Sequence, residues 1–159
     1  MSNSNRYGQH YKNDKNKAKE FEITKEPQRL YAEILLYSAN SPREYRFNIS
    51  RDLWGLCKKL IYQVRIANNT LLGSMARIKN QQKCIKTMLK INDLLPVYSM
   101  CRCISLGQEA AFAKRLNNYR FSFRKWLESD MNRLKGDKFA DMRKILEKMM
   151  DNVLVISSN

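Results

Sequence analysis

The chain has 159 residues, 43% of them apolar, which is enough for one domain with a hydrophobic core. Lys and Arg number 30 against 15 Asp and Glu, a net charge of +15 that favours a polyanionic partner, nucleic acid first and an anionic membrane surface second. No apolar run approaches the roughly 20 residues of a membrane span, and no secretion signal begins the chain, so we expect a cytoplasmic protein.

The first 25 residues are rich in Asn, Lys, Ser and Gln and lack an apolar period, which predicts a disordered basic tail. The run Thr24–Pro27 then indicates a helix start, because proline is tolerated in a first helical turn. Leu30, Ile34 and Tyr37 recur at helical spacing, which predicts a helix to about residue 39.

A second helix start is indicated by Ser41 as N-cap, Pro42 as first helical residue and Glu44 as the acid of a capping box. The core-facing residues that follow are Ile49, Leu53, Leu56, Leu60, Val64 and Ala67. Their spacing predicts a helix of about seven turns. We expect a turn at residues 68–70 or 73–74 to end it.

A third helix is predicted from Met75, Ile78, Ile85, Leu89, Leu94 and Leu95. Pro96 is expected to kink or interrupt it, with a short continuation to about residue 103. Ser105 and Gln108 form another capping-box pattern. The fourth helix that they open carries Phe112, Leu116, Tyr119, Phe123, Trp126, Leu127, Met131 and Leu134.

The end of the chain has the signals of one more short helix. Gly136 is a plausible C-cap for the fourth helix, and Asp137 can begin the next. Its apolar residues are Phe139, Met142, Leu146 and Met149. We therefore predict an all-α protein: a disordered basic tail over residues 1–25, an antiparallel four-helix bundle over 26–135, and an extra C-terminal helix and tail over 136–159.

Positive charge is concentrated on the predicted bundle. Lys79, Lys83, Lys86 and Lys90 follow one another at steps of 4, 3 and 4 residues and form one ridge, which only Asp93 can offset. An ordinary solvated face mixes both signs, so the ridge favours a phosphate-backbone contact over that alternative. The candidate nucleic-acid ligands are Lys58, Lys59, Arg65, Arg77, Lys79, Lys83, Lys86, Lys90, Arg115, Arg120 and Arg124. Phe121 points away from the core positions beside it, as an interface residue or a stacking platform.

Groups for catalysis are sparse. The one histidine, His10, lies in the predicted tail, so neither a His–nucleophile pair nor the Arg-x4-6-His motif of HEPN-type ribonucleases can be built on the bundle. The acids are scattered, and no glycine-rich phosphate loop is present. The cysteines, at 57, 84, 101 and 103, lack zinc-site spacing and are expected to be reduced, buried thiols. We predict a protein that is not an enzyme and has no metal or cofactor.

Two stretches of the chain resemble a known family. Ser-Pro-Arg-Glu-Tyr-Arg-Phe-x-Ile at 41–49 leads to Arg-x-Ala-Asn-Asn at 65–69. Leu-Leu at 94–95 leads to Ile-Ser-x-x-Gln at 104–108, Leu116 and Trp-Leu-Glu-Ser at 126–129. Over about residues 27–130 the chain resembles the four-helix-bundle family that includes the 23S rRNA intervening-sequence proteins. Within it, the chain is most similar to the accessory variability determinant proteins of diversity-generating retroelements.

The resemblance implies a non-catalytic accessory subunit in a bacterial or phage-infected cell. Such proteins form pentameric barrels and bind the retroelement's reverse transcriptase, its template-repeat RNA and cDNA, in support of mutagenic reverse transcription. Pro96 and the pair Arg124–Lys125 depart from the family pattern, so the oligomer number stays open. The alternatives are an intervening-sequence-type bundle that acts as a general RNA-binding or protein-only scaffold, and a bundle nuclease.

Overall fold

The structure, a computed structural model, describes residues 5–134 and 144, with side chains for residues 22–134 and 144. Its elements are five helices: α1 (Asn5–Ser38), α2 (Arg43–Arg46), α3 (Ile49–Asn69), α4 (Met75–Met100) and α5 (Leu106–Arg133). No strand occurs in this described part of the chain. None of the described helices is both long enough and apolar enough to cross a membrane.

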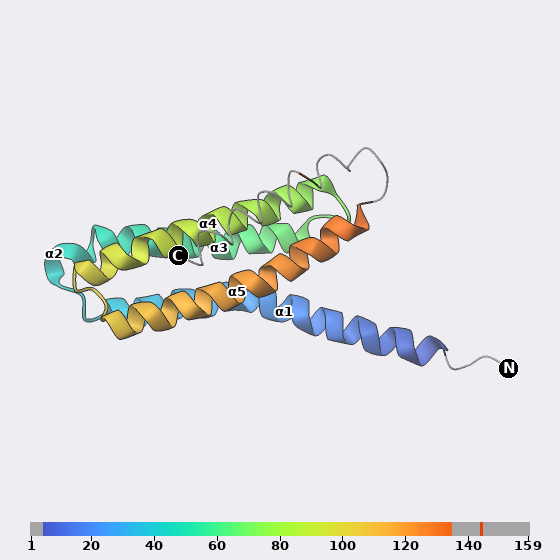
Figure 1. Cartoon of the computed structure of the whole chain (residues 1–159), viewed down its shortest axis with the longest axis horizontal. Coiled ribbons are helices and arrows are strands. Elements are labelled where there is room, and N and C mark those ends of the chain that lie inside the picture. The colour runs from blue at the N-terminus through green and yellow to red at the C-terminus, as the bar shows by residue number, and fades with distance from the viewer. Residues whose placement is uncertain (1–4, 135–143, 145–159) are drawn as a thin grey trace.

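The four long helices form an antiparallel bundle (Figure 1). Each helix packs against two neighbours: α1 against α3 and α5, and α4 against α3 and α5. Helices α3 and α5 therefore lie on one diagonal of the bundle, and α1 and α4 lie on the other. This arrangement confirms the predicted all-α four-helix architecture.

The core comes from the residues whose spacing predicted it. Leu53, Leu60 and Val64 of α3 are buried, as are Phe112 and Phe123 of α5. Full burial of each such side chain contributes about 1.5–3 kcal/mol, so the shared apolar centre is the main stabilising feature of the bundle.

The first helix begins earlier than predicted. Residues 5–25, expected as a tail outside the bundle, belong to α1, and much of this stretch extends beyond the other helices in Figure 1. The predicted helix start at Thr24–Pro27 is wrong, because these residues lie inside α1. A proline there cannot donate to the carbonyl of Ile23, but the Tyr119 hydroxyl of α5 donates to that oxygen at 2.9 Å. A partner from another helix thus compensates for the proline.

The single long helix predicted from residue 41 is divided in two, α2 and α3. The capping box on Ser41 is wrong: Pro42 is the N-cap of α2, and no side chain caps it. The Ser41 hydroxyl instead donates to the carbonyl of Cys103 at 3.3 Å, because Ser41 is buried against the α4–α5 connection.

A buried hydroxyl cluster that the sequence did not reveal joins three helices at this end of the bundle. The Tyr98 hydroxyl of α4 contacts Ser38 of α1 and, at 2.8 Å, Ser50 of α3. The indole of Trp54 donates to the Ser38 hydroxyl at 3.1 Å. These bonds satisfy polar groups that would be costly to bury alone.

The remaining predicted helix boundaries have different outcomes. The Ser105 capping box is confirmed, since the Ser105 hydroxyl accepts from the Gln108 amide and the Gln108 side chain accepts from the Ser105 amide. Helix α4 continues through Pro96 to Met100, so the predicted interruption is wrong. The predicted Gly136 cap lies outside the described residues, as does the C-terminal helix predicted to start at Asp137, apart from Lys144.

Candidate nucleic-acid interface

The α4 lysine ridge, Lys79, Lys83, Lys86 and Lys90, is exposed along its whole length. Its residues lie opposite the face of α4 that points into the core. No carboxylate of the described residues forms an ion pair with a ridge lysine. The Lys83 ammonium donates a hydrogen bond to the Asn80 side chain at 3.5 Å.

Helix α3 adds Lys59 to this surface. The hydroxyl of Thr87 on α4 donates to the side chain of Gln63 on α3 at 2.7 Å, so these residues mark the seam between the two helices. Lys59 lies one turn before Gln63 on α3, and Lys90 lies three residues after Thr87 on α4. Because the two helices run in opposite directions, a step back along α3 and a step forward along α4 lead toward the same end of the bundle. Lys59 and Lys90 are therefore level with each other on opposite sides of the seam.

Lys58 and Arg65 occupy the other side of α3, toward α1. The Lys58 ammonium lies 5.8 Å from the ring centroid of Tyr31 on α1. Arg65 follows seven residues later, which returns it to the same side of the helix. The predicted cations of α3 therefore flank its outer surface from two sides.

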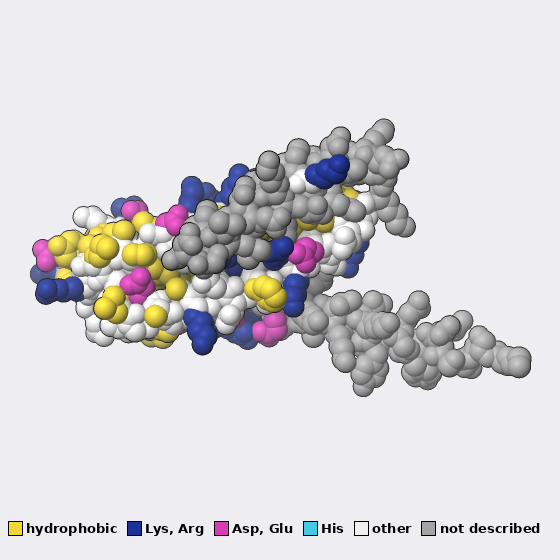
Figure 2. Space-filling view, viewed as in Figure 1, with side chains coloured by type: hydrophobic (Ala, Val, Ile, Leu, Met, Phe, Trp, Pro, Cys, Tyr) yellow, Lys and Arg dark blue, Asp and Glu magenta, His cyan; other side chains and the backbone are white. Residues whose placement is uncertain are grey.

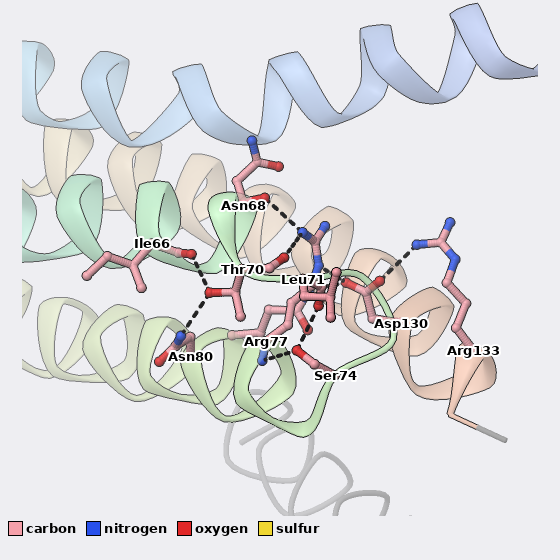
Figure 3. Close-up of polar contacts among 10 residues, drawn as sticks. Ile66, Asn68, Thr70, Leu71, Ser74, Arg77, Asn80, Asp130 and Arg133 are labelled. Carbon is pink, nitrogen blue, oxygen red and sulfur yellow. Dashed lines mark hydrogen bonds and ion pairs between the residues drawn. The ribbon is translucent and has the colours of Figure 1, made fainter. Parts of the chain in front are cut away.

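Arg77 does not belong to this surface, and its prediction as a nucleic-acid ligand is wrong. Its side chain is only 2% exposed. Its Nε donates to Asp130 of α5 at 2.7 Å, and its NH1 donates to the carbonyls of Asn68 and Thr70 (Figure 3). A buried guanidinium requires such compensation, because removing a charge from water without a partner costs several kcal/mol.

Asp130 is the centre of this network. The carboxylate, fully buried, also accepts hydrogen bonds from Gln81 at 2.7 Å and from Arg133 at 2.8 Å. The guanidinium of Arg77 lies 5.0 Å from the ring centroid of Trp126. The network ties the α3–α4 connection and α4 to the end of α5, which is a structural role.

The predicted arginines of α5 are separated from the lysines of α3, because α5 lies diagonally opposite that helix. Arg115 forms ion pairs of 2.6 Å with both Glu26 and Glu33 of α1. The hydrogen bond that Arg115 donates to Glu26, followed by further contributions from both glutamates, raises the pKa of Arg115 against the opposing effect of burial. This guanidinium holds α1 and α5 together.

The other two α5 arginines that were predicted as ligands are also less available than the sequence indicated. Arg124 pairs with Glu128 one turn later at 2.9 Å. Arg120 is half-buried, and burial lowers its pKa. We therefore restrict the candidate interface to the α4 lysine ridge and the cations of α3.

The sequence predicted the exposure of one aromatic ring and missed that of another. Phe121 is exposed as expected, at 58%, with the Lys125 ammonium 4.5 Å from its ring centroid. Tyr62 of α3 is still more exposed, at 64%, and the sequence reasoning missed it. Its signal was its position two residues after Leu60 and two before Val64, which turns it away from the core stripe.

The cysteines are all free thiols. Cys57, Cys84 and Cys103 are buried as predicted, and Cys101 is half-buried. Burial raises the pKa of Cys57 and of Cys84 to about 12. Within the described residues, no group of His, Cys, Asp and Glu side chains is arranged to hold a metal ion.

No family model, no curated protein and no solved structure matches the chain. Inferences about its function therefore depend on the exposed charge and on the resemblance in the sequence.

Proposed function

We propose that the chain is a non-catalytic nucleic-acid-binding protein that contacts phosphates through the α4 lysine ridge and Lys59. The observation that carries the proposal is a row of exposed lysines without carboxylate partners among the described residues. On α3 and α4, both fully described, the only acids are Asp52 and Asp93. Such a surface attracts a polyanion and does not read its sequence.

The dimensions of the ridge support this proposal. Lys79 and Lys90 are separated by eleven helical steps, a rise of about 16 Å. In a duplex, each strand advances about 3.4 Å along the helix axis per phosphate, so the ridge matches the axial length of roughly five phosphates of one strand. Release of their counterions would supply most of the binding free energy.

The resemblance supplies the biological setting of the proposal. As an accessory variability determinant protein, the chain would act beside the reverse transcriptase of a diversity-generating retroelement. It would hold template-repeat RNA and cDNA as a homo-oligomer, and the polymerase would perform the chemistry. The lysine ridge suits this role because it holds phosphates without selecting a sequence.

A binding titration of the purified chain against labelled RNA at several salt concentrations tests the proposal. We expect the triple variant Lys79→Glu/Lys83→Glu/Lys86→Glu to lose most of its affinity and to have a shallower salt dependence. The matched control is Arg43→Glu/Lys114→Glu/Lys125→Glu, which makes the same change in net charge at exposed positions of α2 and α5. Equal losses in the two variants would refute the assignment to the ridge.

A protein-only scaffold is the second candidate function, and the apolar end of the bundle favours it. Figure 2 shows hydrophobic side chains gathered at the end of the molecule where α2 lies. Leu36, Phe47, Met100 and Leu106, all from elements that meet at this end, are each more than 70% exposed. Exposed apolar patches commonly mark protein contacts. A wild-type chain that binds no RNA at low salt would favour this function over the first.

A further inference from the structure

The most exposed aromatic ring on α3 lies in the middle of its cations. Tyr62 is 64% exposed and is surrounded on the helix surface by Lys58, Lys59, Arg65 and Ile66, at three and four residues before and after it. All four neighbours are exposed. The phenol is therefore largely open to solvent, with positive charge before and after it on the helix surface.

Several other tyrosines of the bundle have structural partners. The hydroxyl of Tyr119 binds the carbonyl of Ile23, and that of Tyr37 donates to Glu33 at 2.6 Å. Tyr62 has no hydrogen bond or ring contact with any described residue. Packing within the bundle therefore does not explain why an aromatic ring stands at this exposed position.

An open groove continues this surface along α3. It has a volume of about 610 Å³, and three basic side chains, Arg51, Lys58 and Lys59, outnumber the single acid, Asp52, in its lining. The apolar part of the lining includes Trp54 and Leu94. Gly55 also lines the groove, and a Cβ added there would meet nothing within 4 Å. Because Gly55 precedes Tyr62 by seven residues, the groove and the ring share one side of the helix.

We infer that this surface binds single-stranded nucleic acid, with Tyr62 stacking on an unpaired base while Lys58, Lys59 and Arg65 contact the adjacent phosphates. The inference rests on the proposed function and narrows its ligand. An aromatic ring stacks on any base whose face is free, whereas a duplex already stacks its bases on one another. A basic surface alone would not distinguish these ligands; an exposed ring within it does.

Binding of a labelled uridine 12-mer, compared with a duplex RNA of the same length, tests this inference. We expect Tyr62→Ala to weaken binding of the single strand roughly 10- to 100-fold, to leave binding of the duplex unchanged, and to keep the salt dependence of wild type. Tyr62→Phe should retain affinity because the ring remains. The matched control is Phe121→Ala, which removes an exposed ring from the diagonally opposite helix α5 and should have no effect.

Gly55→Leu provides a second test in which stability and binding move in opposite directions. Leucine is a better helix former than glycine, and the added side chain enters open space, so the variant should unfold at a higher temperature. The same side chain fills the groove, so the single strand should bind several-fold more weakly, again with duplex binding unchanged.

The outcomes separate the inference from the function on which it rests. If Tyr62→Ala binds the single strand as wild type does, or weakens single strand and duplex equally, the inference is overturned while the proposed function stands. If the wild-type chain binds neither RNA in a salt-dependent manner, the proposed function fails and the inference fails with it. Circular dichroism of each variant verifies that the bundle is intact.

Discussion

The α4 lysine ridge and the buried Arg77 network belong to the same helix but have opposite roles. Arg77 and Lys79 are two residues apart, a rotation of about 200° on a helix, so one points into the bundle and the other into solvent. Arg77 is bound by Asp130 and two carbonyls, whereas Lys79 has no carboxylate partner among the described residues. Net charge alone therefore overstates the charge that is available to a ligand.

The residue types fit this division. The planar guanidinium holds several acceptors in fixed directions, which suits the ion pairs of Arg77 and Arg115 inside and between helices. The lysine ammonium is a compact, well-hydrated charge on a flexible stem, which suits repeated contact with a moving phosphate backbone. Arg77 and Arg115 hold the bundle together, and the lysines of the α4 ridge are available to a ligand.

The largest expected effect is a loss of stability when the buried Arg77 network is disrupted. Asp130→Asn leaves the Arg77 guanidinium buried without its carboxylate, and we expect it to lower the free energy of unfolding by about 3–5 kcal/mol. Urea denaturation followed by circular dichroism measures this loss. Adding Arg77→Met should recover part of it, because no unpaired charge then stays buried.

The control for Asp130→Asn is Asp93→Asn, which neutralises an exposed acid of α4 and should change stability by no more than about 0.5 kcal/mol. Similar small losses from both substitutions would show that the Arg77–Asp130 pair is not the structural anchor described above.

Two smaller effects, one on RNA binding and one on stability, distinguish a ridge lysine from an arginine that joins two helices. Lys83→Ala should weaken RNA binding about fivefold at 0.1 M salt and lower the salt slope by about 0.7, with stability unchanged. Arg115→Ala should do the reverse: a loss of up to about 1 kcal/mol of stability from its partly exposed ion pairs, with RNA affinity near that of wild type. RNA titrations and urea denaturation of both variants make the comparison. A loss of RNA affinity in Arg115→Ala equal to that in Lys83→Ala would contradict the division.

A different kind of effect, on thiol reactivity, concerns Cys84, which is adjacent to Lys83 in sequence but points into the core. A nearby lysine commonly lowers the pKa of a thiol, yet burial raises that of Cys84 to about 12. We expect iodoacetamide at pH 8 to modify the half-buried Cys101 first, and Cys57 and Cys84 only after denaturation, as read by mass spectrometry of the peptides. Rapid modification of Cys84 in the native protein would show that the inner face of α4 is open to solvent.

The same thiols should give stability a dependence on alkaline pH. Their folded-state pKa values lie above the reference value of 9.0, so the unfolded chain loses these protons first. The stability is present below about pH 9 and decreases as pH rises toward 12, by up to about 1.4 kcal/mol per pH unit for each thiol. Cys84→Ala should remove its share of this slope.

Much of the fold could be predicted from local patterns in the sequence. The stripe from Leu53 to Ala67 set the inner face of α3, and the Ser105–Gln108 capping box set the start of α5. The spacing of Lys79, Lys83, Lys86 and Lys90 predicted an exposed ridge before any contact was known. These features depend only on residues within a turn or two of one another, which helical geometry relates directly.

The predictions that were wrong involve contacts between residues that are distant in the sequence. Pro27 is accommodated inside α1 because the Tyr119 hydroxyl donates to the Ile23 carbonyl, which has no backbone donor. Ser41 does not cap a helix, and its hydroxyl donates to the Cys103 carbonyl instead. Arg77 looked like one more surface cation until the bundle placed Asp130 beside it, 53 residues further along the chain. The sequence by itself thus determined which faces of the helices are apolar and which are basic. Only the tertiary structure decided which charges are neutralised, because an ion pair depends on distance in space.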